Sequence, residues 1–398
     1  MDAALNDGLA RGRTSPTRRI TARAASVGGI EAALGRIWSD LSREGVATRS
    51  SEGQLMPLAR TRVLTLVVVA SNPETTERAM HTIVKLAGRH PSRTIVLGFG
   101  DPDGPARIDA QVQAHCHPFG DSNEVCTEQI LVRLAGEACQ HPSAVATPLL
   151  LHDLPVVVWW PDDPWMGGPS FAEIVGMADR LIVDSGLFRD DGRARLVGLA
   201  GYARRHLEIH DLGWMRLELW RTLTAGLFDD PLLTPFLGSL DRIRITAARP
   251  GTVLRLTRSA LYLGWLAARL GWRVASPLLP RRDGTLHGAL SRRGGAVEVE
   301  IVGADVAGGD RPRTPGTFDR LELSAKRGRR LADLSIQRFG GHVAAEARID
   351  GRPQALRAAT LERHEDMPYL AAALEAAGPD EFFRAALPVA AELVAPLR

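Results

Sequence analysis

The chain has 398 residues, a length that favours two domains and excludes a single small module. Hydrophobic residues make up 45% of it and charged residues 24%, which is typical of a globular protein with a sizeable core and excludes global disorder. The 49 basic and 46 acidic side chains leave a net charge of only +3, so charge does not indicate a nucleic-acid partner. Charged residues or prolines interrupt the most apolar stretches, and we therefore expect no membrane-spanning segment.

The first 28 residues are predicted to form a flexible tail. Met1–Ser26 contains five arginines but lacks the apolar core of a secretory signal. Helical spacing of apolar residues then predicts a helix over residues 29–44. The cysteines are three in number, Cys116, Cys126 and Cys139, without CxxC spacing, so we expect reduced thiols and a cytoplasmic location.

A doubly wound sheet is predicted to follow. Residues 62–70 are nearly continuous in β-branched and apolar character, as in a strand covered on both faces, and residues 71–73 provide the cap and start of a helix. A strand at 94–99 completes a βαβ unit. Residues 107–117 and 123–134 predict an antiparallel extension of the same sheet.

A further βαβ unit is predicted from strands at 156–160 and 180–184 with a helix between them. Two more helices, over 190–207 and 213–227, are expected before the chain reaches its second domain. We place the first domain at residues 29–235 and describe its fold as α/β, a doubly wound, Rossmann-like sheet that is mixed but mostly parallel.

The second domain, residues 236–398, is predicted to be α+β with an antiparallel sheet. After a strand and an amphipathic helix, residues 283–350 show repeated period-two segments with glycine-rich turns, which indicates a sheet with one solvated face. Alanine-rich helices at 369–377 and 379–394 end the chain, and Pro388 is expected to kink or break the last one.

The motifs that carry nucleotide chemistry are missing from the sequence. The first strand–turn–helix is where a nucleotide enzyme of this fold has its phosphate loop, yet Val69–Glu74 contains no glycine. Neither GxGxxG nor GxxxxGK[ST] follows any predicted strand, so we predict no cofactor site. Ser185 follows a strand as in a nucleophile elbow, but Val183 replaces the required glycine, and we interpret Asp184 or Ser185 as a helix cap.

Two other patterns contain residues that can carry chemistry. The Asp162–Asp163 pair lies in a loop after a strand and could act in acid–base catalysis, but it has no evident partner and a solvated loop is favoured. His115 and His117, with Cys126, could hold zinc, but no second closely spaced pair completes a structural site. We therefore predict no catalytic and no metal-binding residues.

Tryptophan is concentrated in two segments of the chain. Tryptophan and arginine are enriched at protein–protein hot spots, because they form large contacts at modest entropic cost. Trp159 and Trp160 are adjacent on a strand and point to opposite faces, so we expect one of them to belong to the core. The candidates for a partner interface are Trp160, Trp165, Trp214, Arg216, Trp220 and Arg221.

Several segments resemble successive landmarks of the OpcA family, the glucose-6-phosphate dehydrogenase assembly proteins. They are Leu149–Trp160, Ala178–Ser185, Asp211–Arg221 and Leu227–Pro231, in matching order and spacing. The resemblance covers about residues 55 to 275, and the last third of the chain follows it only loosely. The loop at 161–165 departs from the family's usual basic or glycine-containing pattern.

The resemblance implies a non-catalytic cytoplasmic protein that binds glucose-6-phosphate dehydrogenase. Such a protein would act as an assembly factor and allosteric activator, favouring the active oligomer in the oxidative pentose phosphate pathway and so supporting NADPH production. It would need no cofactor, nucleic acid or membrane. The alternative hypothesis is a sugar-phosphate or nucleotide enzyme with a degenerate Rossmann-like loop, which would turn over substrate without any partner.

Overall fold

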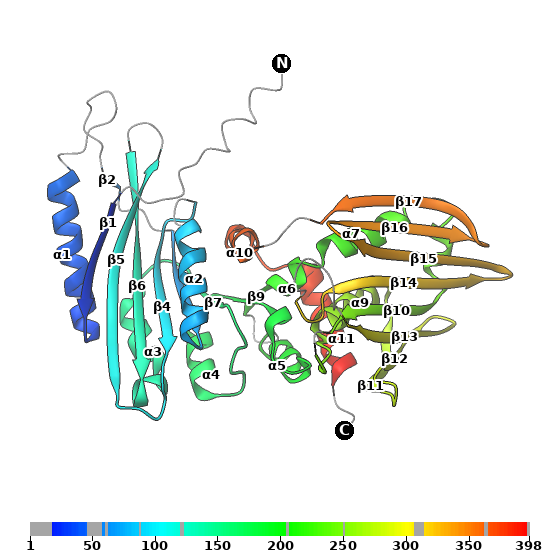
Figure 1. Ribbon diagram of the computed structural model, residues 1–398, viewed down its shortest axis with the longest axis horizontal. Helices are drawn as coiled ribbons and strands as arrows, with labels where there is room; N and C mark the ends of the chain where they lie inside the picture. The colour runs from blue at the N-terminus through cyan, green and yellow to red at the C-terminus, as the bar shows by residue number, and fades with distance from the viewer. Residues whose placement is uncertain are drawn as a thin grey trace, which may run out of the picture. The chain divides into compact units, whose positions relative to one another are not determined.

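The computed structural model forms two compact units (Figure 1). Unit 1 comprises residues 1–182 and 366–375, and unit 2 comprises residues 183–365 and 376–398. Residues 183–235, which the sequence assigned to the first domain, thus pack with the second unit. The structure describes residues 18–45, 58–59, 63–86, 89–119, 123–203, 207–249, 251–305, 314–361 and 365–395.

Unit 1 is built on a mixed sheet whose strand order runs β1-β5-β6-β4-β3-β7-β8, with β2 paired to β6. Pairing is parallel between β6 and β4, between β4 and β3, and between β3 and β7, whereas β5 runs antiparallel to β6. The doubly wound sheet with an antiparallel extension is therefore confirmed. The strands are β1 (Arg18–Ala24), β2 (Leu58–Ala59), β3 (Leu64–Ala70), β4 (Ser92–Phe99), β5 (Arg107–Phe119), β6 (Asn123–Ala135), β7 (Val156–Trp160) and β8 (Arg180–Val183).

The predicted N-terminal tail is wrong for part of its length. Residues 1–17 lie outside the described part of the chain, but Arg18–Ala24 form β1, which pairs antiparallel with β5. This edge strand is short, and the side chains that can be described alternate between half-buried and exposed. Its apolar content is too low for a strand to be recognised from sequence, and pairing with β5 supplies the stability.

Helices cover both faces of this sheet (Figure 1). Helix α1 (Val27–Gly45) confirms the helix predicted over residues 29–44, and it places Trp38 against Glu128 of β6. Helix α2 (Pro73–Leu86) packs on the other face, over β3 and β4. The remaining helices of unit 1 are η1 (Gly136–Cys139), α3 (Pro142–Ala146), η2 (Thr147–Leu149), α4 (Pro169–Gly176) and α10 (Asp366–Glu375).

Unit 2 contains an eight-stranded sheet of order β11-β12-β13-β10-β14-β15-β16-β17. Its pairs are antiparallel, as predicted, except that β10 and β13 run parallel. The strands are β10 (Leu240–Ala248), β11 (Arg273–Pro280), β12 (Leu286–Arg292), β13 (Gly295–Ala304), β14 (Phe318–Arg327), β15 (Arg330–Phe339), β16 (His342–Ile349) and β17 (Arg352–Thr360). The last strand was not predicted, because its arginines and alanines show no apolar alternation.

One face of this sheet packs against helices and the other is polar. Along β13, for example, Val297, Val299 and Ile301 are buried while Glu298 is exposed, the alternation expected of a half-solvated sheet. Helices α7 and α8 contact the sheet. The other elements of unit 2 are η3 (Ser185–Leu187), α5 (Arg193–Ala203), β9 (Glu208–Asp211), α6 (Leu212–Met215), α7 (Glu218–Leu227), α8 (Thr234–Leu237), α9 (Thr257–Leu270) and α11 (Glu381–Val394).

Helices α9 and α11 approach each other closely at Gly264. A Cβ atom built on Gly264 would lie 2.4 Å from the carbonyl oxygen of Ala386, so only glycine fits there. Helix α11 continues through Pro388, and the break considered from sequence does not occur. No helix in the described ranges combines the length and apolar character that crossing a membrane requires.

Candidate interaction site

Two tryptophans of unit 1, Trp160 and Trp165, lie at the loop that follows β7. Trp160 is fully buried, with its ring centroid 5.5 Å from that of Trp165 and 5.1 Å from that of Phe171. Trp165 also makes an edge contact with Phe99, at 4.6 Å between ring centroids. Trp165 stays partly exposed, so of these two candidates only Trp165 presents surface to a partner.

The carboxylate of Asp162 fixes the start of this loop to the turn between β3 and α2. Its Oδ2 accepts a hydrogen bond of 3.0 Å from the backbone N–H of Ser71 and another from the Ser71 hydroxyl. Burial raises the pKa of Asp162, whereas these two hydrogen bonds act to lower it. In a dinucleotide-binding fold, the end of the first strand and the start of its helix hold a pyrophosphate. Here a side-chain carboxylate binds that turn instead.

In unit 2, Trp214 lies between Arg221 of α7 and the first residues of α11. The indole is 1% exposed, and its Nε1 donates a hydrogen bond of 2.7 Å to Oδ2 of Asp380, the residue that caps α11. The guanidinium of Arg221 stacks over the Trp214 ring at 3.6 Å from its centroid. Burial lowers the pKa of Arg221, whereas the negative charges of Asp380 and Glu218 act to raise it. The accessible part of this cluster is therefore Arg221 and not Trp214.

Arg216 belongs to a buried charged network at the turn after β8. Its guanidinium bonds to Oδ2 of Asp184, whose other oxygen caps η3 through the N–H of Gly186 at 3.0 Å. Ser185 is fully buried and donates a 2.6 Å hydrogen bond from its hydroxyl to Asp211. Ser185 thus has no access to a substrate, and the prediction that Asp184 or Ser185 is a cap is confirmed for Asp184.

Asp211 is the centre of this network and was not singled out from sequence. Its Oδ1 accepts hydrogen bonds from the backbone N–H groups of Ser185, at 2.8 Å, and of Gly213, at 2.9 Å. Burial, together with the nearby charge of Asp184, raises the pKa of Asp211 to about 6. The signal that could have identified it is its position directly before a short helix, where aspartate is a preferred cap.

Two arginines at the beginning of α9 complete the network. Arg255 donates a 2.8 Å hydrogen bond to the carbonyl of Gly186, and Arg258 donates one of 2.7 Å to the hydroxyl of Thr317. Arg258 is only 5% exposed, and burial lowers its pKa while Asp184 acts in the opposite direction. The network ties the turn after β8 to α9.

Trp220 is part of the unit 2 core. It is 4% exposed and makes an edge contact with Phe318 of β14, with 5.3 Å between ring centroids. The six interface candidates therefore divide into two groups. Trp160, Trp214 and Trp220 are buried within their own units, whereas Trp165, Arg216 and Arg221 remain partly accessible.

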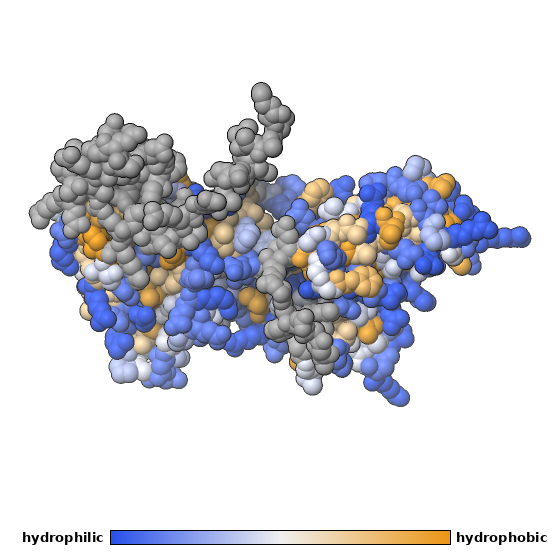
Figure 2. Space-filling view, turned by 45° about the horizontal axis from the view of Figure 1, so that its top comes forward, coloured by the Kyte–Doolittle hydropathy of each residue, from blue (hydrophilic) through white to orange (hydrophobic). Residues whose placement is uncertain are grey.

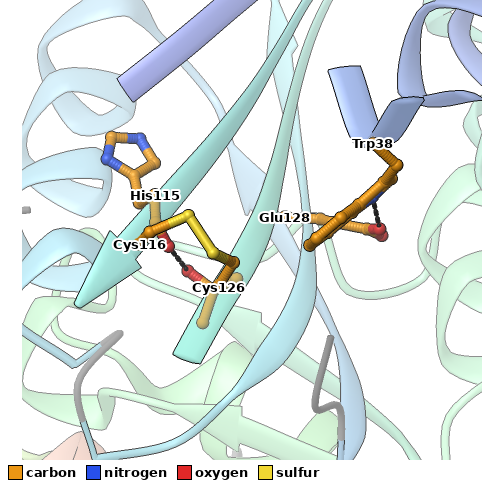
Figure 3. The surroundings of a disulfide bond; sticks show 6 residues. Trp38, His115, Cys116, Cys126 and Glu128 are labelled. Carbon is orange, nitrogen blue, oxygen red and sulfur yellow. Dashed lines mark hydrogen bonds between the residues drawn. A yellow bond between two sulfur atoms is a disulfide. The ribbon is translucent and has the colours of Figure 1, made fainter. Parts of the chain in front are cut away.

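The expectation of three reduced cysteines is wrong. Cys116 of β5 and Cys126 of β6 form a disulfide, and only Cys139 is free (Figure 3). The two positions face each other directly across the strand pair, which brings their Cα atoms within 4.0 Å. Antiparallel pairing of the two segments was predicted, but the register that brings the cysteines together was not. Burial raises the pKa of the Cys139 thiol.

The disulfide also argues against the zinc site considered from sequence, because the sulfur of Cys126 is bonded to Cys116 and is not a free thiolate. His115 points away from the disulfide, and its Nε2 lies 3.0 Å from Oε1 of Gln113 (Figure 3). The side chain of His117 lies outside the described part of the structure. Across the residues that are described, no group of three or more potential ligands could hold a metal ion.

Fold and site together define a two-unit α/β protein whose polar clusters are built to hold turns and helix ends. Two family models match it, in chain order. The model described as the glucose-6-phosphate dehydrogenase subunit N-terminal domain matches residues 84–198, and the one described as the C-terminal domain of that subunit matches residues 207–387. The chain belongs to the OpcA family, as the resemblance implied.

Curated relatives carry the same family name. The OxPP cycle protein OpcA of Synechocystis sp. is 33% identical over 194 residues, which is 48% of this chain and 39% of that protein. The OpcA of Nostoc punctiforme is 29% identical over 229 residues, 56% of this chain and 48% of that protein. The chain thus spans less than half of the length of the curated relatives that it matches.

Two solved structures illustrate the level of similarity found among known structures. The WlbA dehydrogenase of Thermus thermophilus has a TM-score of 0.41 and 13% identity, covering 84% of this chain and 96% of that one. An oxidoreductase from Sinorhizobium meliloti has a TM-score of 0.45 and 10% identity, with 84% and 88% covered. Similarity at this level has no bearing on activity.

Proposed function

We propose that this protein is a non-catalytic assembly factor and allosteric activator of glucose-6-phosphate dehydrogenase. The observation that carries the proposal is the ordered match of two models, each described as a domain of a glucose-6-phosphate dehydrogenase subunit, to residues 84–198 and 207–387. The relatives' names, which place them in the OxPP cycle, point to the same pathway. We propose the cytoplasm as the location of the protein. The Cys116–Cys126 disulfide is an unusual feature for that compartment, because cytosolic thiols are kept reduced.

The local structure favours binding over catalysis. Asp162 places a carboxylate against the turn before α2, where a bound dinucleotide would need to place its phosphates. Ser185, the one serine with an elbow-like position, is buried and bonded to Asp211. Both features argue against the alternative hypothesis of a sugar-phosphate or nucleotide enzyme.

Activation would follow from differential binding. A protein that binds the active oligomer of the dehydrogenase more tightly than its inactive form shifts the population toward the active form. A stable complex of this kind buries about 800 Å² on each partner. We propose Trp165, Arg216 and Arg221 as contact residues, because each combines a hot-spot residue type with a partly accessible side chain.

The test is a binding titration of the purified chain against the glucose-6-phosphate dehydrogenase of the same organism. Arg221→Ala uncovers Trp214 without removing a core side chain, and we expect it to weaken binding about tenfold or more. Arg282→Ala removes an exposed arginine from the β11–β12 turn and is the matched control. Equal affinity of the wild type and Arg221→Ala would remove Arg221 from the interface, and absence of binding by the wild type would refute the function.

A further inference from the structure

Unit 1 contains a cavity between its sheet and the helices α2 and α10. Gln129 of β6 forms part of the wall on the side of the sheet, and Leu374 forms part of it on the side of α10. The residue before Gln129, Glu128, bonds to Trp38 of α1. Because successive side chains of a strand point to opposite faces, Gln129 faces away from α1 and toward the cavity.

The amide of Gln129 is buried without a partner from the protein. The side chain is 1% exposed, and neither its Nε2 nor its Oε1 has a hydrogen-bond partner in the part of the chain that the structure describes. Hydrophilic residues cover much of the surface in Figure 2, where solvent can bond to them. A buried amide needs the same bonds from another source, because burial without them is unfavourable. The amide therefore calls for a ligand that both accepts and donates a hydrogen bond.

Two hydroxyl groups of β4 also line the cavity. Thr94 pairs directly with Gln129 across the sheet, and its Oγ1 lies 3.1 Å from Oγ of Ser92. That hydrogen bond uses one of the two hydroxyl protons and leaves the second for another partner. The hydroxyl pair thus offers a further hydrogen bond to a ligand beside Gln129.

The wall of the cavity favours an uncharged ligand. Its one titratable side chain among the described residues is His90, whose Nε2 lies 3.1 Å from Oε1 of Glu375 on α10. Burial lowers the pKa of His90, although the charge of Glu375 acts in the opposite direction. A neutral ring and neutral hydroxyl and amide groups provide no countercharge for an ion.

The size of the cavity limits the ligand further. The volume that the centre of a water molecule can occupy is about 10 Å³. One water molecule needs about this volume, together with about two to four polar partners. The amide of Gln129 and the hydroxyl pair supply that number.

We propose that this cavity binds one water molecule, which accepts a hydrogen bond from Nε2 of Gln129 and donates one to its Oε1, with the Ser92–Thr94 hydroxyl pair as the third partner. The site lies beneath α10, which packs in unit 1 although the residues on both sides of it in the chain belong to unit 2. The water is thus part of the surface that holds α10, as is Arg180, whose Nη1 donates a 2.7 Å hydrogen bond to the carbonyl of Ala373. This inference does not depend on the proposed function.

A crystal structure of the full chain and the melting temperature of one variant test the proposal together. In the wild type we expect a water peak at about 2.7–3.2 Å from both amide atoms of Gln129. Gln129→Met keeps the length of the side chain and removes both polar atoms. If a water molecule satisfies the amide, this variant loses hydrogen bonds, and we expect a melting temperature lower by about 2–4 °C. Gln140→Met makes the same exchange at an exposed position of unit 1 and should leave the melting temperature unchanged.

An unpartnered amide would give the opposite result. Its removal would relieve the cost of a buried polar group, so Gln129→Met would melt at a higher temperature than the wild type. An unchanged or higher melting temperature therefore overturns the proposal. A wild-type cavity without a water peak also overturns it, even if the variant melts earlier, since poor packing of methionine then accounts for the loss. If Gln129→Met does not fold, the wild-type crystal structure decides.

Discussion

Replacing Gly264 by alanine should destabilise unit 2, although alanine is the better helix former. Gly264 lies within α9, where the exchange to alanine normally stabilises a helix by about 1 kcal/mol. The new Cβ would lie 2.4 Å from the carbonyl oxygen of Ala386 and 3.0 Å from the backbone nitrogen of Ala390. Both atoms belong to the backbone of α11, so no side chain can move to make room.

The magnitude follows from the distance that the helices must separate. Ordinary contacts of this kind are about 3.4 Å, so α9 and α11 would have to move apart by about 1 Å. Overpacking of this degree costs about 3 kcal/mol, the upper part of the usual range, because the obstacle is backbone. After subtracting the gain in helix propensity, we expect a net loss of about 2 kcal/mol and a melting temperature lower by about 4–8 °C.

Gly201 provides the matched control. It lies in α5 of the same unit, it is exposed, and a Cβ atom there would meet nothing within 4 Å. Gly201→Ala should therefore raise the stability of unit 2 by about 0.5–1 kcal/mol. Urea unfolding and calorimetry of both variants measure the two effects. If Gly264→Ala is as stabilising as Gly201→Ala, the close packing of α9 against α11 is refuted.

Three further predictions concern the disulfide, the buried carboxyl and the buried indole. Cys116→Ser should lower the free energy of unfolding by about 3 kcal/mol, since it opens a loop of about ten residues; finding three free thiols in the native protein as isolated would contradict the disulfide. Because the folded-state pKa of Asp211 is about 6, above its ordinary value of 3.8, its contribution is greatest below pH 4 and is lost as the pH rises through 6. Relative to Asp211→Asn, the wild type should therefore lose about 2–3 kcal/mol between pH 4 and pH 7, as measured by urea unfolding; parallel pH profiles would show that Asp211 titrates normally. Trp214→Ala should cost about 3–5 kcal/mol in thermal or urea unfolding, because it leaves a cavity and removes the hydrogen bond to Oδ2 of Asp380; an unchanged melting temperature would place Trp214 on the surface instead.

Strands covered on both faces were predictable from their composition, because burial demands continuous apolar character. The strand predicted at 156–160 has the bounds observed for β7. The observed N-terminal ends of β3 and β4 each differ from the predicted ones by only two residues. Edge strands could not be predicted with the same method. Strands β1 and β17 are held by pairing with one neighbour, and such pairing leaves little signal in the amino-acid pattern.

The candidate site was predictable in part. Residue type drew attention to Trp214, Arg216 and Arg221 as interface candidates, and the structure places them in networks that connect distant parts of unit 2. Their role at an interface stays a prediction. Residue type alone does not distinguish a buried tryptophan from an exposed one, because the large amphipathic indole ring occurs both in cores and at interfaces. Asp380, the partner of Trp214, was missed because 166 residues separate the two. The disulfide was missed because its formation depends on strand register.

In the function that we propose, this protein acts by binding a dehydrogenase and not by chemistry of its own. The most direct measurement is the rate of NADP⁺ reduction by glucose-6-phosphate dehydrogenase as purified chain is added, with parallel measurement of the sedimentation coefficient. The account predicts a rate that rises to saturation as a larger complex forms, with no turnover by the chain alone. A rate and a sedimentation coefficient that both stay constant, or catalysis by the isolated chain, would contradict it.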